Sequence, residues 1–520
     1  MQLIEIHALQ SIPVSNLNRD EGGSPKETWF GGTRRARVSS QSWKYAIRTE
    51  FNDWIKSTTA DYAGMNVHQS RKHLDKIVKE LCKQGKKKKI LELNEDEIKD
   101  VLKEHLFSGK KGIFNFAGGN EADKTVYALS EKETAKIVKC ILDLCEKDKK
   151  GQPIKEETEF LELLFEGENG KLKKDKENNL FPKAALIAAA DEIKGRKAIG
   201  VNTALFGRMM ANIPAASVDA SVSVAHALGI NVLQAEADFF TAVDDLSTSG
   251  EDPDQEQDVG AGHLTYADYN TSIYYRYALL DVEELDKNLR KVLAGKEQDD
   301  NGSSINSSTE KREETVAEIA AKFVELFLTT LPVGNKNKHA GYARPDFSLI
   351  ISGREQPLNL VNAFLDPLAV QRVTARYRSQ NKQDKKSREV YDKETMSSAA
   401  ETLLRWKHQV DKAYGSNEKE EDFIITTLDD DVNRIINNAS LSESSEAKSS
   451  SKENNDTAGT RKAQITDLRE ADKQRAPVPS LISLAQIKSK VIQKQMNVPP
   501  EKKNTADDQV TENEPDAGDN

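Results

Sequence analysis

Residues 29–48, WFGGTRRARVSSQSWKYAIR, decide how the first part of this chain folds. Gly31 and Gly32 lack side chains, so the backbone there can turn tightly or approach another segment closely. Ser39 and Ser40 are good helix N-caps. After them, apolar residues recur at helical spacing: Trp43, Ala46, Ile47, Trp54 and Ile55. The stretch predicts a glycine turn followed by an amphipathic helix over residues 40–56.

The same stretch carries a local excess of positive charge. Gln41, Lys44 and Arg48 are three and four residues apart and share a second face of the predicted helix. From residue 26 to residue 48 there are six basic residues and one acidic residue, Glu27, in a chain of net charge -10. The basic residues are Lys26, Arg34, Arg35, Arg37, Lys44 and Arg48. Two interpretations remain open: a solvated basic face, or a phosphate-binding edge that uses the free N–H groups of a capped helix start.

Composition limits the class of protein. Of the 520 residues only 37% are hydrophobic and 31% are charged, which indicates polar insertions or tails around a smaller core. No apolar run approaches the ~20 residues of a membrane span. Three cysteines do not form a disulfide framework, so we expect a reducing, cytoplasmic location.

Several stretches together resemble one known family. They are LNRDEGG (17–23), FGGTRRARVSSQSWKYAIR (30–48), NTALFGRMM (202–210), DASVSVAHAL (219–228), DFFTAVDDL (238–246), GHLTYADYNTSIYYRYALL (262–280) and PLNLVNAF (357–364). In order and spacing they resemble the CasC family, the backbone subunits of the type I-E CRISPR surveillance complex, Cascade. The resemblance covers most of residues 1–370.

The order of the predicted elements indicates the fold class. Residues 2–9 alternate as a half-buried strand, and 199–210, 217–228, 270–280 and 346–352 also have strand character. Residues 283–331 are helical pieces around a polar insert at 301–309. With the helix at 40–56, this gives an α+β fold in the ferredoxin-like order that RNA-recognition modules also use.

The resemblance implies a palm of this RRM type with a large helical insertion, the fingers, and a protruding thumb loop. We expect these divisions: palm, first half, 1–56; fingers, 57–198; palm strands, 199–240; thumb loop, 241–268; palm, second half, 269–400; a largely disordered polar insertion, 401–475; a closing helix, 476–497; and a disordered tail, 498–520. The lysine block of Lys83 and 86–89 is most simply a solvated face. The acidic stretches at 251–258 and 410–475 have no assigned role.

The resemblance also implies an RNA site. Six residues match positions that line the guide-RNA groove of the family: Arg19, Lys26, Ser39, Gln41, Lys44 and Arg48. We add Arg34, Arg208 and Met209, the last as an apolar wedge between bases, although a methionine is more often a core residue. Tyr45 departs from the basic residue often found at its position. Arg276 is either a further backbone contact or a structural residue.

The predicted function is a non-catalytic backbone subunit, with no cofactor and no metal. Its partners would be the guide RNA, target DNA by way of the guide, copies of itself stacked head to tail, and other Cascade subunits. The histidines do not have metal-ligand spacing, and His226 is more typical of a hydrogen-bonded residue than of a base. Two alternatives stay open. One is RNA cleavage through Asp20, as in related type III subunits, against which stands a role as a turn cap or ion-pair partner. The other is a free-standing RNA chaperone.

Overall fold

The structure is a computed structural model of the chain. It describes residues 3–58, 62–88, 94–102, 127–148, 167–168, 171–172, 195–196, 198–210, 214–242, 263–293, 305–354, 356–368, 372–373, 390–391, 395–415 and 423–427. Among the helices that it describes, none combines the length and the apolar character that a membrane span requires.

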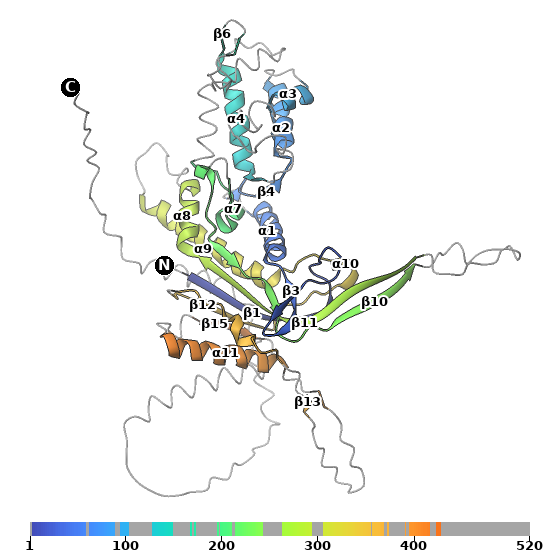
Figure 1. Cartoon of the computed structure of the whole chain (residues 1–520). Helices are drawn as coiled ribbons and strands as arrows, with labels where there is room; N and C mark the ends of the chain where they lie inside the picture. The colour runs from blue at the N-terminus through green and yellow to red at the C-terminus, as the bar shows by residue number, and fades with distance from the viewer. Residues whose placement is uncertain are drawn as a thin grey trace, which may run out of the picture.

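A nine-stranded sheet forms the centre of the molecule, and its main path runs β15-β12-β1-β11-β9-β3-β2 (Figure 1). The strands are β1 (Leu3–Ser15), β2 (Glu27–Phe30), β3 (Thr33–Val38), β8 (Val222–Val224), β9 (Ala227–Gly229), β10 (Ala235–Ala242), β11 (His263–Asp281), β12 (Phe347–Ser352) and β15 (Phe423–Thr427). Strand β1 lies antiparallel between β11 and β12, and β8 and β9 pair antiparallel with β11. This is the ferredoxin-like arrangement, and the predicted α+β fold is confirmed.

Helices cover both faces of the sheet (Figure 1). They are α1 (Ser40–Ser57), α7 (Val201–Phe206), α8 (Val282–Leu293), α9 (Ile305–Thr329), α10 (Lys336–His339) and α11 (Thr395–Tyr414), with short 3-10 turns η4 (Pro214–Ala216) and η7 (Leu360–Phe364). One core cluster packs α1, α8 and α9 on the first face, and a second packs α11 and η7 on the other.

Coverage of both faces explains the burial of β1. The alternating pattern predicted a half-buried strand, but Glu5 and His7 on its polar face are as fully buried as Ile4 and Ile6. The polar face is satisfied by long-range contacts: Leu358 N–H donates to Glu5 at 2.8 Å, and His7 Nδ1 lies 2.9 Å from the Tyr275 hydroxyl. The prediction of one solvated face was therefore wrong, because α11 and η7 cover that side.

The glycine turn joins β2 and β3 in a hairpin. Gly31 and Gly32 have φ of 57° and 72°, the left-handed region that favours glycine. A Cβ on Gly31 would lie 1.6 Å from the Leu365 carbonyl oxygen, whereas one on Gly32 would meet nothing within 4 Å. The buried Arg35 guanidinium donates to the carbonyls of Phe364 and Leu365 at 3.2 Å. The hairpin is therefore fixed against the segment that follows η7.

The described part of the expected fingers region is largely helical. It contains β4 (Val67–Ser70) and β5 (Tyr127–Ser130), which pair, and α2 (His73–Lys88), α3 (Glu95–Leu102) and α4 (Glu131–Asp148). The short pair β6 (Gly167–Glu168) and β7 (Lys171–Leu172) lies in the same range. Helices α2 and α4 project from the end of α1 (Figure 1). We call α2, α3, α4, β4 and β5 the helical insertion; the boundaries of the predicted divisions remain predictions.

One predicted strand is a helix. Residues 199–210 contain α7, which ends at Gly207 with φ of 77°. The polar Asn202 and Thr203 are buried, because α7 packs between α1, β4 and α8. A short apolar run does not distinguish a buried strand from a buried helix, and here tertiary packing decided. Of 217–228, only β8 and β9 are strand.

Strands β10 and β11 form an arm that leaves the sheet (Figure 1). Their pairing runs from Ala235 opposite Asn270 to Ala242 opposite His263. The predicted thumb loop at 241–268 is thus strand at both of its ends. Residues 243–262, with the acidic 251–258 stretch, lie outside the described residues.

The C-terminal prediction was partly wrong. The expected polar insertion from 401 begins inside α11, whose Ala399, Ala400 and Leu403 are fully buried in the second core cluster. Strand β15 then adds to β12 with Phe347 opposite Thr427. Helix α9 likewise begins inside the polar insert at 301–309. The predicted closing helix at 476–497 and the tail at 498–520 lie outside the described residues; two short strands, β13 (Arg372–Val373) and β14 (Val390–Tyr391), pair with each other.

Candidate nucleic-acid interface

The start of α1 is fixed by local hydrogen bonds. Ser39 is the N-cap, as predicted: its hydroxyl accepts from Ser42 N–H at 3.3 Å, and its own N–H donates to Asn18 Oδ1 at 2.9 Å. Trp43, Ala46, Ile47 and Ile55 point into the core, which confirms the predicted apolar face. The opposite side of the helix is therefore held at the surface in one orientation.

Lys44 and Arg48 lie one turn apart on that outward side, each half-buried. Partial burial lowers the pKa of the Lys44 ammonium, and the neighbouring Arg48 charge lowers it further. Burial also lowers the pKa of Arg48. Neither side chain has a carboxylate partner among the residues that the structure describes. Two repelling, partly desolvated cations without an anion form a site that an anion would stabilise.

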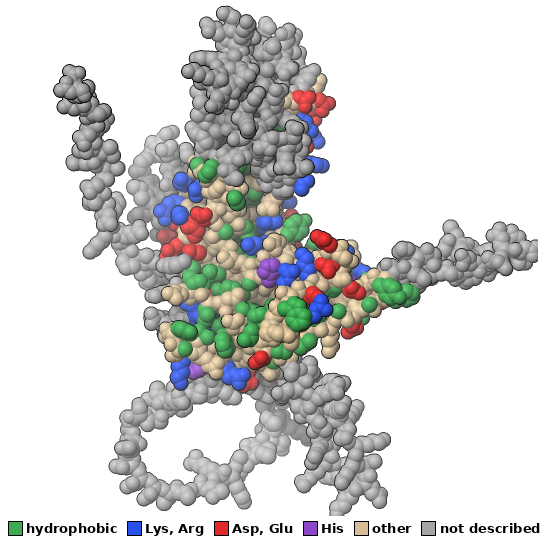
Figure 2. Space-filling view, viewed as in Figure 1, with side chains coloured by type: hydrophobic (Ala, Val, Ile, Leu, Met, Phe, Trp, Pro, Cys, Tyr) green, Lys and Arg blue, Asp and Glu red, His purple; other side chains and the backbone are tan. Residues whose placement is uncertain are grey.

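A second cationic group lies at the N-terminal end of α1. His226 Nδ1 accepts from Ser40 N–H at 3.4 Å and lies 3.3 Å from an Arg37 guanidinium nitrogen. Burial, then Arg37 and Lys26, lower the pKa of His226. Figure 2 shows a histidine surrounded by Lys and Arg side chains near the middle of this face. The basic edge thus continues from α1 onto β3 and β9.

A cleft of about 630 Å³ opens between α1 and the helical insertion. Its cationic lining comes from Arg48, Lys72 and Lys76, and its lining residues include no aspartate or glutamate. Tyr45, 57% exposed, lies at the same cleft and presents a ring where the family resemblance led us to expect a basic residue. An apolar, non-ionic surface beside cations is what stacked bases and phosphates require together.

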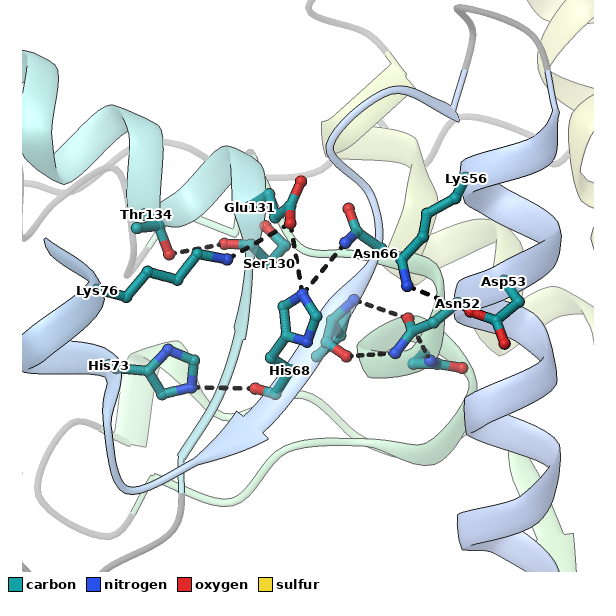
Figure 3. A network of polar contacts seen from close by, with 12 residues as sticks. Asn52, Asp53, Lys56, Asn66, His68, His73, Lys76, Ser130, Glu131 and Thr134 are labelled. Atoms are coloured by element: carbon teal, nitrogen blue, oxygen red, sulfur yellow. Dashed lines mark hydrogen bonds and ion pairs between the residues drawn. The ribbon is translucent and has the colours of Figure 1, made fainter. Parts of the chain in front are cut away.

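Polar contacts hold the cleft walls together (Figure 3). Asn52 of α1 makes two bonds to the Val67 backbone of β4, at 2.7 and 3.0 Å, and accepts from Asn202 of α7 at 3.0 Å. On the other side His68 and Lys76 both lie 3.4 Å from a Glu131 oxygen. The helical insertion is therefore tied to α1 by side chain to backbone bonds, which fixes the width of the cleft.

The remaining predicted RNA residues divide into exposed and buried ones. Arg19 and Gln41 are exposed, and Met209 is 88% exposed, two residues after the cleft-lining Gly207. Arg34 is exposed and pairs with Glu27. Arg208 is buried, with its guanidinium 2.7 Å from Glu133 and bonded to the Ala216 carbonyl at 3.0 Å. Its guanidinium is occupied by the fold, so it adds nothing to the cationic surface here.

Arg276 lies in the core, where its guanidinium carbon is 3.7 Å from the centroid of the Trp43 ring and 4.5 Å from that of Phe327. Complete burial lowers its pKa to about 9. Of the two roles left open by the sequence, the structural one fits this position.

Asp20 has the geometry of a turn cap. Its Oδ1 accepts from Ser24 N–H at 3.0 Å, and its own N–H donates to the Ser24 carbonyl at 2.9 Å. Within the described ranges, no group of three or more His, Cys, Asp or Glu side chains is placed to hold a metal ion.

Sequence reasoning missed the cleft residues Lys72 and Lys76 and the position of His226. The signal for Lys72 was available, because VHQSRKH (67–73) follows directly on the helix and is basic. His226 came to α1 only through the pairing of β3 with β9.

Comparison with known proteins now places the chain. A profile of the family described as CT1975-like protein matches residues 4–450. The chain belongs to the CT1975-like protein family. Among curated proteins, no relative matches.

Two solved structures resemble this CT1975-like protein. A chain from a "CRISPR RNA-guided surveillance complex, pre-nicking" is 25% identical, with a TM-score of 0.53; the match covers 82% of this chain and 92% of that one. A chain from a "CRISPR RNA-guided surveillance complex" is 20% identical, with a TM-score of 0.41, covering 82% and 89%. The first likeness extends over nearly the whole length of that chain.

Proposed function

We propose that this protein is a backbone subunit of a Cascade-type CRISPR surveillance complex, of type I-E. It would hold the guide RNA by its phosphates, stack head to tail with copies of itself and contact other Cascade subunits in the cytoplasm. Target DNA would then be recognised by base pairing with the guide rather than by side chains. Membership of the CT1975-like family and the likeness to a chain of a CRISPR RNA-guided surveillance complex support the proposal.

The Lys44–Arg48 pair is the observation that carries it. A cation pair one turn apart, partly desolvated and without a carboxylate partner in the described structure, gains most from an anion that contacts both. Successive phosphates of one strand supply such an anion. The edge continues through Lys26, Arg37 and His226, so the bound strand would run along the start of α1.

The decisive experiment measures guide-RNA affinity against salt for the full chain. Each phosphate contact on a single strand contributes about 0.7 to the log–log slope. Lys44→Gln/Arg48→Gln should flatten the slope by about 1.4, so between 50 and 200 mM salt the wild type loses about 7-fold more affinity than the variant. Lys287→Gln/Lys291→Gln on α8 makes the same charge change at an exposed site and serves as the control. Equal slopes for all three proteins would remove the pair from the RNA site.

We also propose that the subunit is not catalytic. The turn-cap bonds of Asp20 support this role, because they account for its carboxylate within the loop. The assembled complex, incubated with matching single-stranded RNA and magnesium, should leave the RNA intact. Regularly spaced cuts that disappear in Asp20→Ala would overturn the non-catalytic assignment.

A further inference from the structure

Helix α2 carries a row of lysines that the guide-binding role does not use. Between residues 71 and 88 there are eight basic residues and two acidic ones. Five exposed lysines are spaced four, three, four and three residues apart, so they share one face of the helix. They are Lys72, Lys76, Lys79, Lys83 and Lys86, and we call them the α2 stripe.

The opposite face of α2 explains why the stripe stays at the surface. Ile77, Val78, Leu81 and Cys82 are buried, and α2 packs through them against α4 and α3. Figure 2 shows Lys and Arg side chains along this side of the helical insertion. The stripe is a fixed row, about 20 Å long at 1.5 Å per residue.

The charge of the stripe is only slightly neutralised. Asp75 is engaged 2.7 Å from Lys99 of α3, and Glu80 lies 4.0 Å from Lys83. Lys76 shares Glu131 with His68. For Lys79 and Lys86, the described part of the chain holds no carboxylate in ion-pair contact. The neighbouring α4, by contrast, has four lysines and five acidic residues, so the excess is particular to α2.

The chemistry of this face suits a duplex rather than a single strand. Proteins that hold single strands combine cations with aromatic rings on which bases stack, and α2 contains no Phe, Tyr or Trp. A duplex keeps its bases stacked inside and presents phosphates alone. With a rise of about 3.4 Å per base pair, 20 Å corresponds to about six base pairs of one strand.

We propose that the α2 stripe is a second nucleic-acid surface, which binds the phosphate backbone of double-stranded DNA without reading its sequence. This goes beyond guide binding, and it does not depend on it, because the stripe and the Lys44–Arg48 pair lie on different helices.

The test uses the full-length chain and a 24-base-pair DNA duplex unrelated to any guide. Each phosphate contact on duplex DNA contributes about 0.9 to the salt slope, so Lys79→Gln/Lys86→Gln should flatten it by about 1.8. Between 50 and 200 mM salt, the wild type should lose about 12-fold more duplex affinity than this variant. Lys287→Gln/Lys291→Gln is again the control, and it should keep the wild-type slope.

Three results would overturn the proposal. They are a wild-type chain that does not bind the duplex, a slope that the stripe variant leaves unchanged, and a stripe variant that weakens guide RNA as much as duplex. The guide-binding proposal fails by a different result, an unchanged guide slope in Lys44→Gln/Arg48→Gln. Saturating guide RNA should leave duplex binding intact, whereas displacement would mean one shared site.

Discussion

Gly31 and Gly32 provide a matched pair for testing how the hairpin is held. Both have positive φ, so an alanine at either position adopts the left-handed region at a cost of about 1 kcal/mol. Only at Gly31 does the new Cβ meet backbone, 1.6 Å from the Leu365 carbonyl oxygen. At Gly32 there is no neighbour within 4 Å. The two substitutions therefore share strain and differ in the clash.

The clash can be given a magnitude. Moving the Leu365 backbone away costs about 1–3 kcal/mol as overpacking. It also lengthens the two bonds from Arg35 to the Phe364 and Leu365 carbonyls, each worth about 1 kcal/mol. We expect Gly31→Ala to lower the free energy of unfolding by about 3–5 kcal/mol in total, against about 1 kcal/mol for Gly32→Ala.

Urea unfolding followed by tryptophan fluorescence measures both values under the same conditions. The midpoint gives the change in free energy where the slope with urea is unchanged. Equal losses within about 0.5 kcal/mol would refute the reasoning, since strain alone would then account for both glycines.

Three further predictions concern the cleft and its supports. Glu133→Gln leaves the Arg208 guanidinium buried without its carboxylate and should cost about 3–5 kcal/mol in urea unfolding, with partial recovery in Glu133→Gln/Arg208→Met; a loss below about 1 kcal/mol would contradict the pair's structural role. Nearby cations hold the pKa of His226 below 6.5, and phosphates would raise it again, so RNA binding takes up a proton and guide affinity should increase from pH 7.5 to 5.5, an increase that His226→Gln abolishes. Asn52→Ala removes both bonds to the Val67 backbone and should accelerate hydrogen exchange of the Val67 amide; unchanged protection would show that the joint is held elsewhere.

The sequence by itself determined the elements whose signals are local. The N-cap at Ser39, the apolar face of α1 and the glycine turn depend on residues within a few positions of one another, and all three are present. The order of strands and helices also sufficed for the ferredoxin-like sheet, because short antiparallel connections leave few alternative arrangements.

Tertiary structure alone decided which cations face solvent. Arg34 and Arg35 are neighbours in a basic run, yet Arg34 is exposed, whereas Arg35 is buried on carbonyls that lie about 195 and 330 residues along the chain. Charge and spacing are the same for both residues in the sequence. Their fates differ because β3 turns alternate side chains to opposite faces, and only the folded chain brings η7 against one of them.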